Sequence, residues 1–198
     1  MFIQVIQGPC TRQDELRALA DSWETEVGAT DGWLGGTFGF TDDNEFLGVV
    51  RFESKEAAEA NSKRPEQDAW AAKMRALMDG DLEFHDCDDV REFLDGGSDD
   101  AKFVQIIRGH LDDRSALDAL MSDPDGLRQM RPDIIGGTVA IEADGTFTET
   151  VAFRDEASAR AAENDPGAAP PPEIQAALDK MMVDAKFYDL HHPWFESP

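Results

Sequence analysis

Hydrophobic and polar positions along the first half of the chain follow two different periods. Short apolar runs closed by turn-forming residues predict β-strands at residues 2–8, 33–40, 45–53 and 82–87. Apolar residues recur at helical spacing in three other segments, residues 11–27, 54–63 and 66–78. The predicted order is therefore βαββαβ with the second helix broken near Pro65, which is the ferredoxin-like pattern.

The second half repeats this pattern. The alternating residues Phe2, Gln4, Ile6 and Gly8 recur as Phe103, Gln105, Ile107 and Gly109. The same offset relates the two Gly-Gly-Thr segments that begin at Gly35 and Gly136. A constant offset over so many similar positions indicates a tandem duplication. We predict a first α+β repeat at residues 1–94, a polar, Gly-rich linker at 95–101 and a second repeat at 102–198.

The strand pair at 33–40 and 45–53 and its counterpart at 134–141 and 146–153 predict two hairpins. Asn44 and Gly145 hold the same place in the two turns, and both residue types tolerate the left-handed backbone that such turns need. Pairing across the first turn predicts a Phe-rich face toward the helices and a face with Trp33 and Gly35 on the other side. We expect the small residues of this second face to allow close approach of the two sheets.

Composition limits the classes of partner. The formal net charge of −24, with only 18 Lys and Arg, disfavours binding to nucleic acid or to an anionic membrane surface. Met1 leads directly into a strand, and no long apolar run follows, so we expect a cytoplasmic protein without a membrane span. Cys10 and Cys87 have no cysteine at the equivalent places of the second repeat, and we expect free thiols.

Two stretches carry a specific resemblance, "DGWLGGTFGF" and "GVVRFESKEAAEA". With a preceding strand of the "FIQVIQG" kind, they resemble the antibiotic biosynthesis monooxygenase-like family of dimeric α+β barrels. The resemblance covers each half of the chain once. It implies an α+β fold in which two ferredoxin-like βαββαβ repeats form an intramolecular dimeric α+β barrel. Because family members dimerise through their bare sheet faces, we expect this fused chain to be a monomer that acts as a built-in pseudo-dimer.

The resemblance implies several activities, which include cofactor-independent oxygenation of polycyclic phenols and haem degradation. The haem-degrading branch uses a Trp on the helix after the third strand, where this chain has Ala60 or Ala161. No His occurs at residues 52–74 or 154–181 to serve as an axial ligand. We therefore expect no haem, and no other cofactor is indicated.

Gln4 and Gln105 are polar residues in apolar rows, at the position that lines the ligand pocket in the family. A pocket role and a buried Gln hydrogen-bonded to backbone are both open interpretations. The candidate substrate-binding residues are Gln4, Gln105, Phe38, Phe52 and Phe153. Glu149 shares the apolar face in the second repeat, so its pKa could be raised, and it is the candidate catalytic base. Trp23 and Trp70 are expected in the core.

A metal site is not expected. His191 and His192 would point to opposite faces of a continuing strand, and His110 would lie at the far end of the neighbouring strand. Two classes of function remain open. One is a cofactor-independent monooxygenase or related enzyme that acts on a small aromatic or apolar substrate. The other is a non-catalytic small-molecule-binding or structural module that keeps the barrel without the chemistry.

Overall fold

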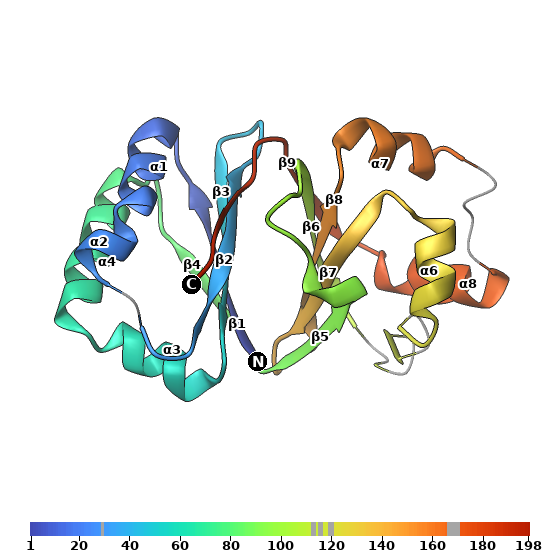
Figure 1. The fold of residues 1–198 in the computed structure, drawn as a ribbon, viewed down its shortest axis with the longest axis horizontal. Helices are drawn as coiled ribbons and strands as arrows, with labels where there is room; N and C mark the ends of the chain where they lie inside the picture. Colours follow the sequence, from blue (N-terminus) through green and yellow to red (C-terminus); the bar gives the residue numbers. More distant parts are fainter. Residues whose placement is uncertain (29, 112–113, 115–116, 119–120, 166–170) are drawn as a thin grey trace. The chain divides into compact units, whose positions relative to one another are not determined.

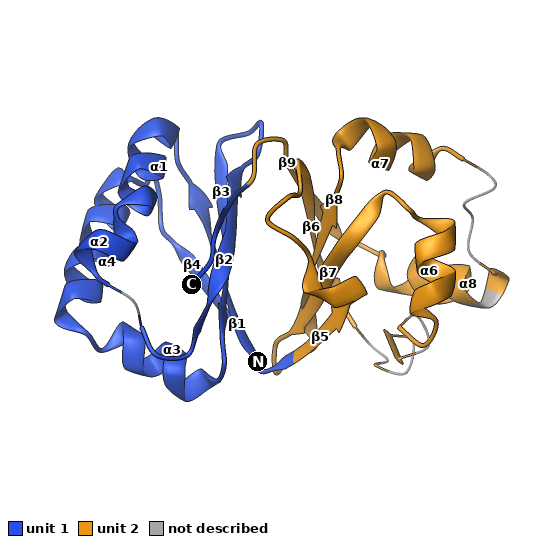
Figure 2. Ribbon diagram, in the orientation of Figure 1, with its two compact units in different colours: residues 1–89, 194–198 blue, residues 90–193 orange. Residues whose placement is uncertain are grey.

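The computed structural model describes residues 1–198 apart from residues 29, 112–113, 115–116, 119–120 and 166–170. The chain divides into two compact units, residues 1–89 with 194–198 and residues 90–193 (Figure 2). Each unit contains one five-stranded sheet, and the described α-helices of each unit lie on one face of that sheet (Figure 1).

The first unit has the strand order β10-β2-β3-β1-β4, with antiparallel neighbours throughout. Its strands are β1 (Phe2–Pro9), β2 (Trp33–Phe40), β3 (Glu45–Phe52), β4 (Glu83–Cys87) and β10 (Trp194–Glu196). Its helices are α1 (Gln13–Asp21), α2 (Trp23–Glu26), α3 (Lys55–Ser62) and α4 (Pro65–Leu77). Pro65 is the first residue of α4. At this position a backbone N–H would have no acceptor within the helix, so proline costs no hydrogen bond. The predicted break in the helix is therefore confirmed.

The second unit has the strand order β5-β7-β8-β6-β9. Its strands are β5 (Asp89–Phe93), β6 (Phe103–His110), β7 (Ile134–Ile141), β8 (Thr146–Phe153) and β9 (Lys186–Leu190). Its described helices are η1 (Leu94–Gly96), α6 (Pro124–Met130), α7 (Glu156–Glu163) and α8 (Pro172–Met181). The predicted break at Pro166 lies outside the described residues.

Strand register confirms the duplication. In the first unit Gln4 lies opposite Val50 of β3 and Asp86 of β4. In the second unit Gln105 lies opposite Val151 and Asp189 in the same way. Both hairpin turns are also as predicted, because Asn44 has φ +62° and Gly145 has φ +93°. The two halves therefore build the same sheet from different residues.

Two short strands were not anticipated from the sequence. β5 follows β4 along the chain but lies in the second sheet, and β10 follows β9 but lies in the first sheet. Each sheet thus receives its outermost strand from the segment that ends the other repeat. The compact units and the sequence repeats are consequently different divisions of the chain, and the repeat boundaries stay a prediction.

A β-bulge at Leu34 corrects the predicted face of Trp33. Trp33 lies opposite Phe52, and the next paired residue is Gly35, which lies opposite Arg51. One residue is skipped, so Trp33 shares the helix-facing side with Phe52. Gly35 has φ +111°, and a Cβ there would lie 2.6 Å from the backbone oxygen of Glu196. The Gly-Gly-Thr segment is therefore explained by the bulge and by close approach of β10.

The Phe-rich face of each sheet packs against the helices, as predicted. In the first unit two clusters form this core, made up of Cys10, Leu16, Phe46, Met74, Met78 and Trp194, and of Phe2, Phe52 and Ala58. In the second unit Phe147 and Phe103 anchor the corresponding two clusters. Cys10 and Cys87 are buried thiols that are not part of a disulfide, and burial raises the pKa of Cys10.

Candidate functional site

An apolar cavity of about 100 Å³ lies between the sheet and the helices of the first unit. Strands β1, β2, β3 and β10 form its floor, and all four helices of the unit contribute to its walls. Its lining residues are Gln4, Ile6, Leu16, Ala20, Trp23, Trp33, Phe38, Phe46, Val50, Phe52, Asn61, Ser62, Gln67, Trp70, Met74 and Glu196. Three of the predicted binding residues, Gln4, Phe38 and Phe52, line this cavity.

Aromatic rings form much of the wall and are held by hydrogen bonds. The rings of Trp23 and Trp33 are 4.9 Å apart between centroids. Trp23 donates its indole N–H to Oε1 of Gln67 at 2.8 Å, and Trp70 donates to the backbone oxygen of Leu19 at 3.1 Å. Trp23 and Trp70 were expected in the core: Trp70 packs against it, whereas Trp23 is half-buried, and both residues line the cavity. The fixed rings present flat apolar surfaces to anything bound.

Two amide side chains interrupt the apolar lining. Gln4 donates its Nε2 to Oδ1 of Asp86 at 2.9 Å, a carboxylate rather than the backbone partner considered from the sequence. Asn61 is only 7% exposed, and its Oδ1 accepts from the hydroxyl of Thr30 at 3.0 Å. Within the part of the chain that the structure describes, the Asn61 amide nitrogen has no hydrogen-bond acceptor. Because Asn61 lines the cavity, this donor is available to a bound molecule.

In the second unit, the equivalent glutamine belongs to a charged network. Gln105 donates its Nε2 to Oδ1 of Asp189 at 2.8 Å, and Arg160 pairs with the other oxygen of Asp189. The Arg160 guanidinium also lies 5.1 Å from the ring centroid of Phe103. Phe153 packs against Phe103, with centroids 5.6 Å apart. The roles of Gln105 and Phe153 in substrate binding stay predictions.

Glu149 lies on the helix-facing side of the second sheet. Its cross-strand neighbours are Ile107 and Val139, and its neighbours on the same face of β8 are Phe147 and Val151. The half-buried side chain has no hydrogen-bond or ion-pair partner among the described residues. Loss of hydration raises the pKa of its carboxyl group to about 7, the direction predicted from the sequence. Its catalytic role stays a prediction.

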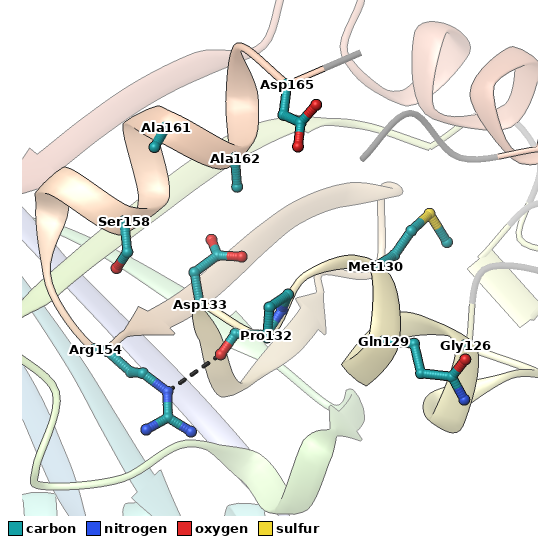
Figure 3. Close-up of a pocket in the computed structure, with 10 residues that line it drawn as sticks. All are labelled: Gly126, Gln129, Met130, Pro132, Asp133, Arg154, Ser158, Ala161, Ala162 and Asp165. Atoms are coloured by element: carbon teal, nitrogen blue, oxygen red, sulfur yellow. Dashed lines mark hydrogen bonds between the residues drawn. The ribbon is translucent and has the colours of Figure 1, made fainter. Parts of the chain in front are cut away.

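A second hollow lies on the surface of the second unit and is open to solvent (Figure 3). It has a volume of about 810 Å³ and lies between α6 and α7. Its polar groups are largely paired within the protein: Arg154 donates its Nε to the backbone oxygen of Pro132 at 3.1 Å, and Arg131 donates to the buried carboxylate of Asp133 at 2.7 Å. The smaller first-unit cavity is therefore the better candidate for a specific site.

His191, one of the histidines considered for metal binding, contacts a carboxylate. Nδ1 of His191 lies 2.8 Å from Oε2 of Glu156. Among the described residues, no group of three or more His, Cys, Asp or Glu side chains could hold a metal ion. In the same part of the chain, no helix has both the length and the apolar character needed to span a membrane.

Comparison with solved structures defines the class of fold. No protein-family model and no curated protein matches the sequence. A structure from Lactobacillus acidophilus described as a "putative monooxygenase" matches with a TM-score of 0.70 and 13% identity over 96% of this chain and 92% of its own. One from Fusobacterium nucleatum with the same description gives 0.73 and 11% identity over 99% and 94%.

A third structure, described as an "anthrone oxidase-like protein", gives a TM-score of 0.68 and 10% identity over 99% of this chain and 93% of its own. These matches extend over both repeats of the chain. The chain therefore shares the fold of these structures, and the α+β fold with two ferredoxin-like repeats that was predicted from the sequence is confirmed. At these identities the similarity concerns the fold alone.

Sequence reasoning did not predict several residues of the cavity, among them Asn61, Trp33 and Glu196. Asn61 stands in an Ala-rich helix, and its position on the buried face was the available signal. Trp33 was placed on the wrong face because the bulge was not foreseen. Glu196 was missed because a three-residue strand joining the other repeat's sheet leaves no clear periodic pattern.

Proposed function

We propose that the first unit binds a small, single-ring aromatic molecule in its apolar cavity. The observation that carries this proposal is the combination of aromatic walls with a buried Asn61 donor that faces the cavity. Aromatic rings offer apolar contact in fixed orientations, and one unpaired polar group sets the orientation of a ligand. Gln4, Phe38 and Phe52 belong to the proposed site.

The size of the cavity sets the size of the ligand. Sites for drug-sized molecules are usually about 300 to 1,000 Å³, whereas an engineered apolar cavity of about 150 Å³ accommodates benzene. At about 100 Å³ this cavity is close to the smaller case. A single ring fits with small rotations of the lining side chains, whereas a polycyclic phenol would need the helices to move.

We further propose that the bound molecule is a phenol that reacts with dioxygen without a cofactor. The fold similarity to structures described as monooxygenases supports this step. In the simplest case the phenolate carbon attacks dioxygen, and the resulting hydroperoxide loses water to give a quinone. One phenol and one dioxygen thus yield one quinone and one water. The site's task would be to hold the ring, orient its oxygen and exclude bulk water.

A cavity-filling variant tests binding. Ala20 lines the cavity from α1, and Ala20→Leu would fill much of the space. We expect fluorobenzene, followed by fluorine NMR and by tryptophan fluorescence, to bind the wild type and to bind Ala20→Leu at least tenfold more weakly. Ala72→Leu, on the exposed side of α4, is the matched control and should bind as the wild type does. If Ala20→Leu bound fluorobenzene as tightly as the wild type does, the ligand would bind outside this cavity.

Oxygen uptake distinguishes the enzyme from the alternative binding module. With simple phenols and hydroquinones as substrates, an oxygenase would consume dioxygen faster than background autoxidation, and Ala20→Leu would remove the excess. Binding that is abolished by Ala20→Leu, without any oxygen uptake by the wild type, would support the non-catalytic module instead.

A further inference from the structure

The strands β5 and β10, which each lie in the sheet of the other repeat, are called the exchanged strands below, and they carry residues at equivalent positions. The strands that precede them, β4 and β9, give the offset that relates these positions. Phe84 and Phe187 hold the same register position, opposite Ile6 and Ile107 respectively. The offset between these two residues also relates Phe93 of β5 to Glu196 of β10. One position of the exchanged strand is therefore aromatic in one unit and acidic in the other.

Strand register directs the side chain of Glu196 toward the helices. Glu196 lies opposite Gly36 of β2, and Gly36 lies opposite Val50 of β3. Residues directly opposite each other in antiparallel strands share a face. Val50 and Glu196 both line the cavity, so the carboxylate lies on the apolar, helix-facing side of the sheet.

The second unit gives independent evidence that this position points inward. A Cβ on Gly137, the counterpart of Gly36, would lie 2.5 Å from Cζ of Phe93. The Phe93 ring also packs against both hydrophobic clusters of the second unit. An inward position that is filled by an apolar ring in one unit therefore holds a carboxylate in the other, and this carboxylate lines the cavity of the first unit.

We propose that Glu196 is the acidic anchor of the first-unit cavity and selects aromatic molecules that carry a hydroxyl or amino donor. This inference rests on the proposed function, because it specifies the ligand of the same cavity. A carboxylate has acceptor positions for about four hydrogen bonds, so it can accept from a ligand in addition to its partners in the protein. The net charge of −24 also disfavours anionic ligands and leaves neutral or cationic donors.

Two probes of similar size separate this inference from the proposed function. Fluorobenzene reports binding to the apolar cavity, and 4-fluorophenol adds one hydroxyl donor. We expect the wild type to bind 4-fluorophenol at least tenfold more tightly than fluorobenzene, because a hydrogen bond to a charged group is worth about tenfold or more in affinity. Fluorine NMR titration gives both affinities in the same buffer.

Substitution of Glu196 provides the decisive comparison. We expect Glu196→Leu to bind fluorobenzene as the wild type does and to lose the preference for 4-fluorophenol. Glu196→Gln, which keeps an acceptor oxygen, should retain part of the preference. Glu66→Leu, an exposed position on α4, is the matched control and should retain all of it.

Each outcome decides between the two claims. A wild type that binds both probes equally, or a Glu196→Leu variant that still prefers 4-fluorophenol, would overturn the role of Glu196 while leaving the cavity as a binding site. A wild type that binds neither probe would overturn both the proposed function and this inference.

Discussion

The isolated carboxyl group of Glu149 makes the stability of the protein depend on pH. Its pKa is about 7 in the folded protein, against an ordinary value of 4.5, because its apolar neighbours remove water. The folded state therefore holds this proton more tightly than the unfolded state does. The associated stability is fully present below about pH 4.5 and is lost as the pH rises through about 7.

The size of this effect follows from the difference between the two pKa values. One pKa unit corresponds to about 1.4 kcal/mol, so the change from 4.5 to about 7 corresponds to about 3.5 kcal/mol at most. Residual solvent contact of the half-buried side chain makes this an upper value. Glu149→Gln has a similar shape and does not ionise. We expect the variant to gain up to about 3 kcal/mol over the wild type between pH 5 and pH 8.

Urea unfolding at several pH values tests this expectation. Far-UV circular dichroism follows the sheets of both units, whereas tryptophan fluorescence follows the first unit, since all four tryptophans belong to it. In thermal unfolding, the Tm difference between the variant and the wild type should be larger at pH 8 than at pH 5 by about 6 to 12 °C. Glu92→Gln, at an exposed position, should show no such gain.

Parallel pH profiles for the wild type and Glu149→Gln would refute the reasoning. They would mean that water or a rearranged side chain stabilises the ionised carboxylate after all. A larger gain at low pH than at high pH would contradict the sign of the argument, because desolvation penalises only the charged form.

Two further predictions concern the edges of the sheets. Gly35→Ala and Gly136→Ala should each destabilise the fold by about 1 to 3 kcal/mol in urea unfolding, because both glycines have positive φ and the new Cβ would meet a backbone oxygen within 2.6 Å; unchanged unfolding midpoints would contradict the bulge. Trp194→Ala should cost about 3 to 5 kcal/mol, since the buried indole of β10 stacks on Phe38 at 5.6 Å; a loss below about 1 kcal/mol in the same assay would show that β10 contributes little.

Local patterns were sufficient to predict the repeated βαββαβ order. The hairpins, the break before Pro65 and the helix-facing phenylalanines depend on periodicity and turn chemistry, which act over short stretches of chain. The pairing of Gln4 with Asp86 and of Gln105 with Asp189 also had a signal, because both acidic residues recur with the offset of Phe84 and Phe187.

The rest of the candidate site depends on contacts between distant segments. β10 contains three residues, and its pairing with β2 is decided by the available sheet edge rather than by its own propensity. The cavity depends on how the rings of Trp23 and Trp33 pack, which no sequence period encodes. The face of Trp33 was predicted wrongly because of a single bulged residue, since one skipped position moves every residue beyond it to the opposite face of the sheet.

The sizes of neighbouring side chains explain why the inward carboxylate lies on different strands in the two units, Glu196 on β10 in the first and Glu149 on β8 in the second. A Cβ at Gly48 would lie 3.0 Å from the ring of Phe38, so the first unit has no room for a larger side chain at this position of β3. In the second unit the smaller Val139 stands opposite Glu149, and the carboxylate fits.

The aromatic ring that covers Gly36, or its counterpart Gly137, comes from a different strand in each unit. In the first unit the ring over Gly36 comes from Phe38 of the same strand, and in the second unit the ring over Gly137 comes from Phe93 of the exchanged strand. With Phe38 in place, the exchanged strand of the first unit needs no ring, and its inward position can hold the carboxylate of Glu196. Divergence at these positions thus gives the interiors of the two units different chemistry.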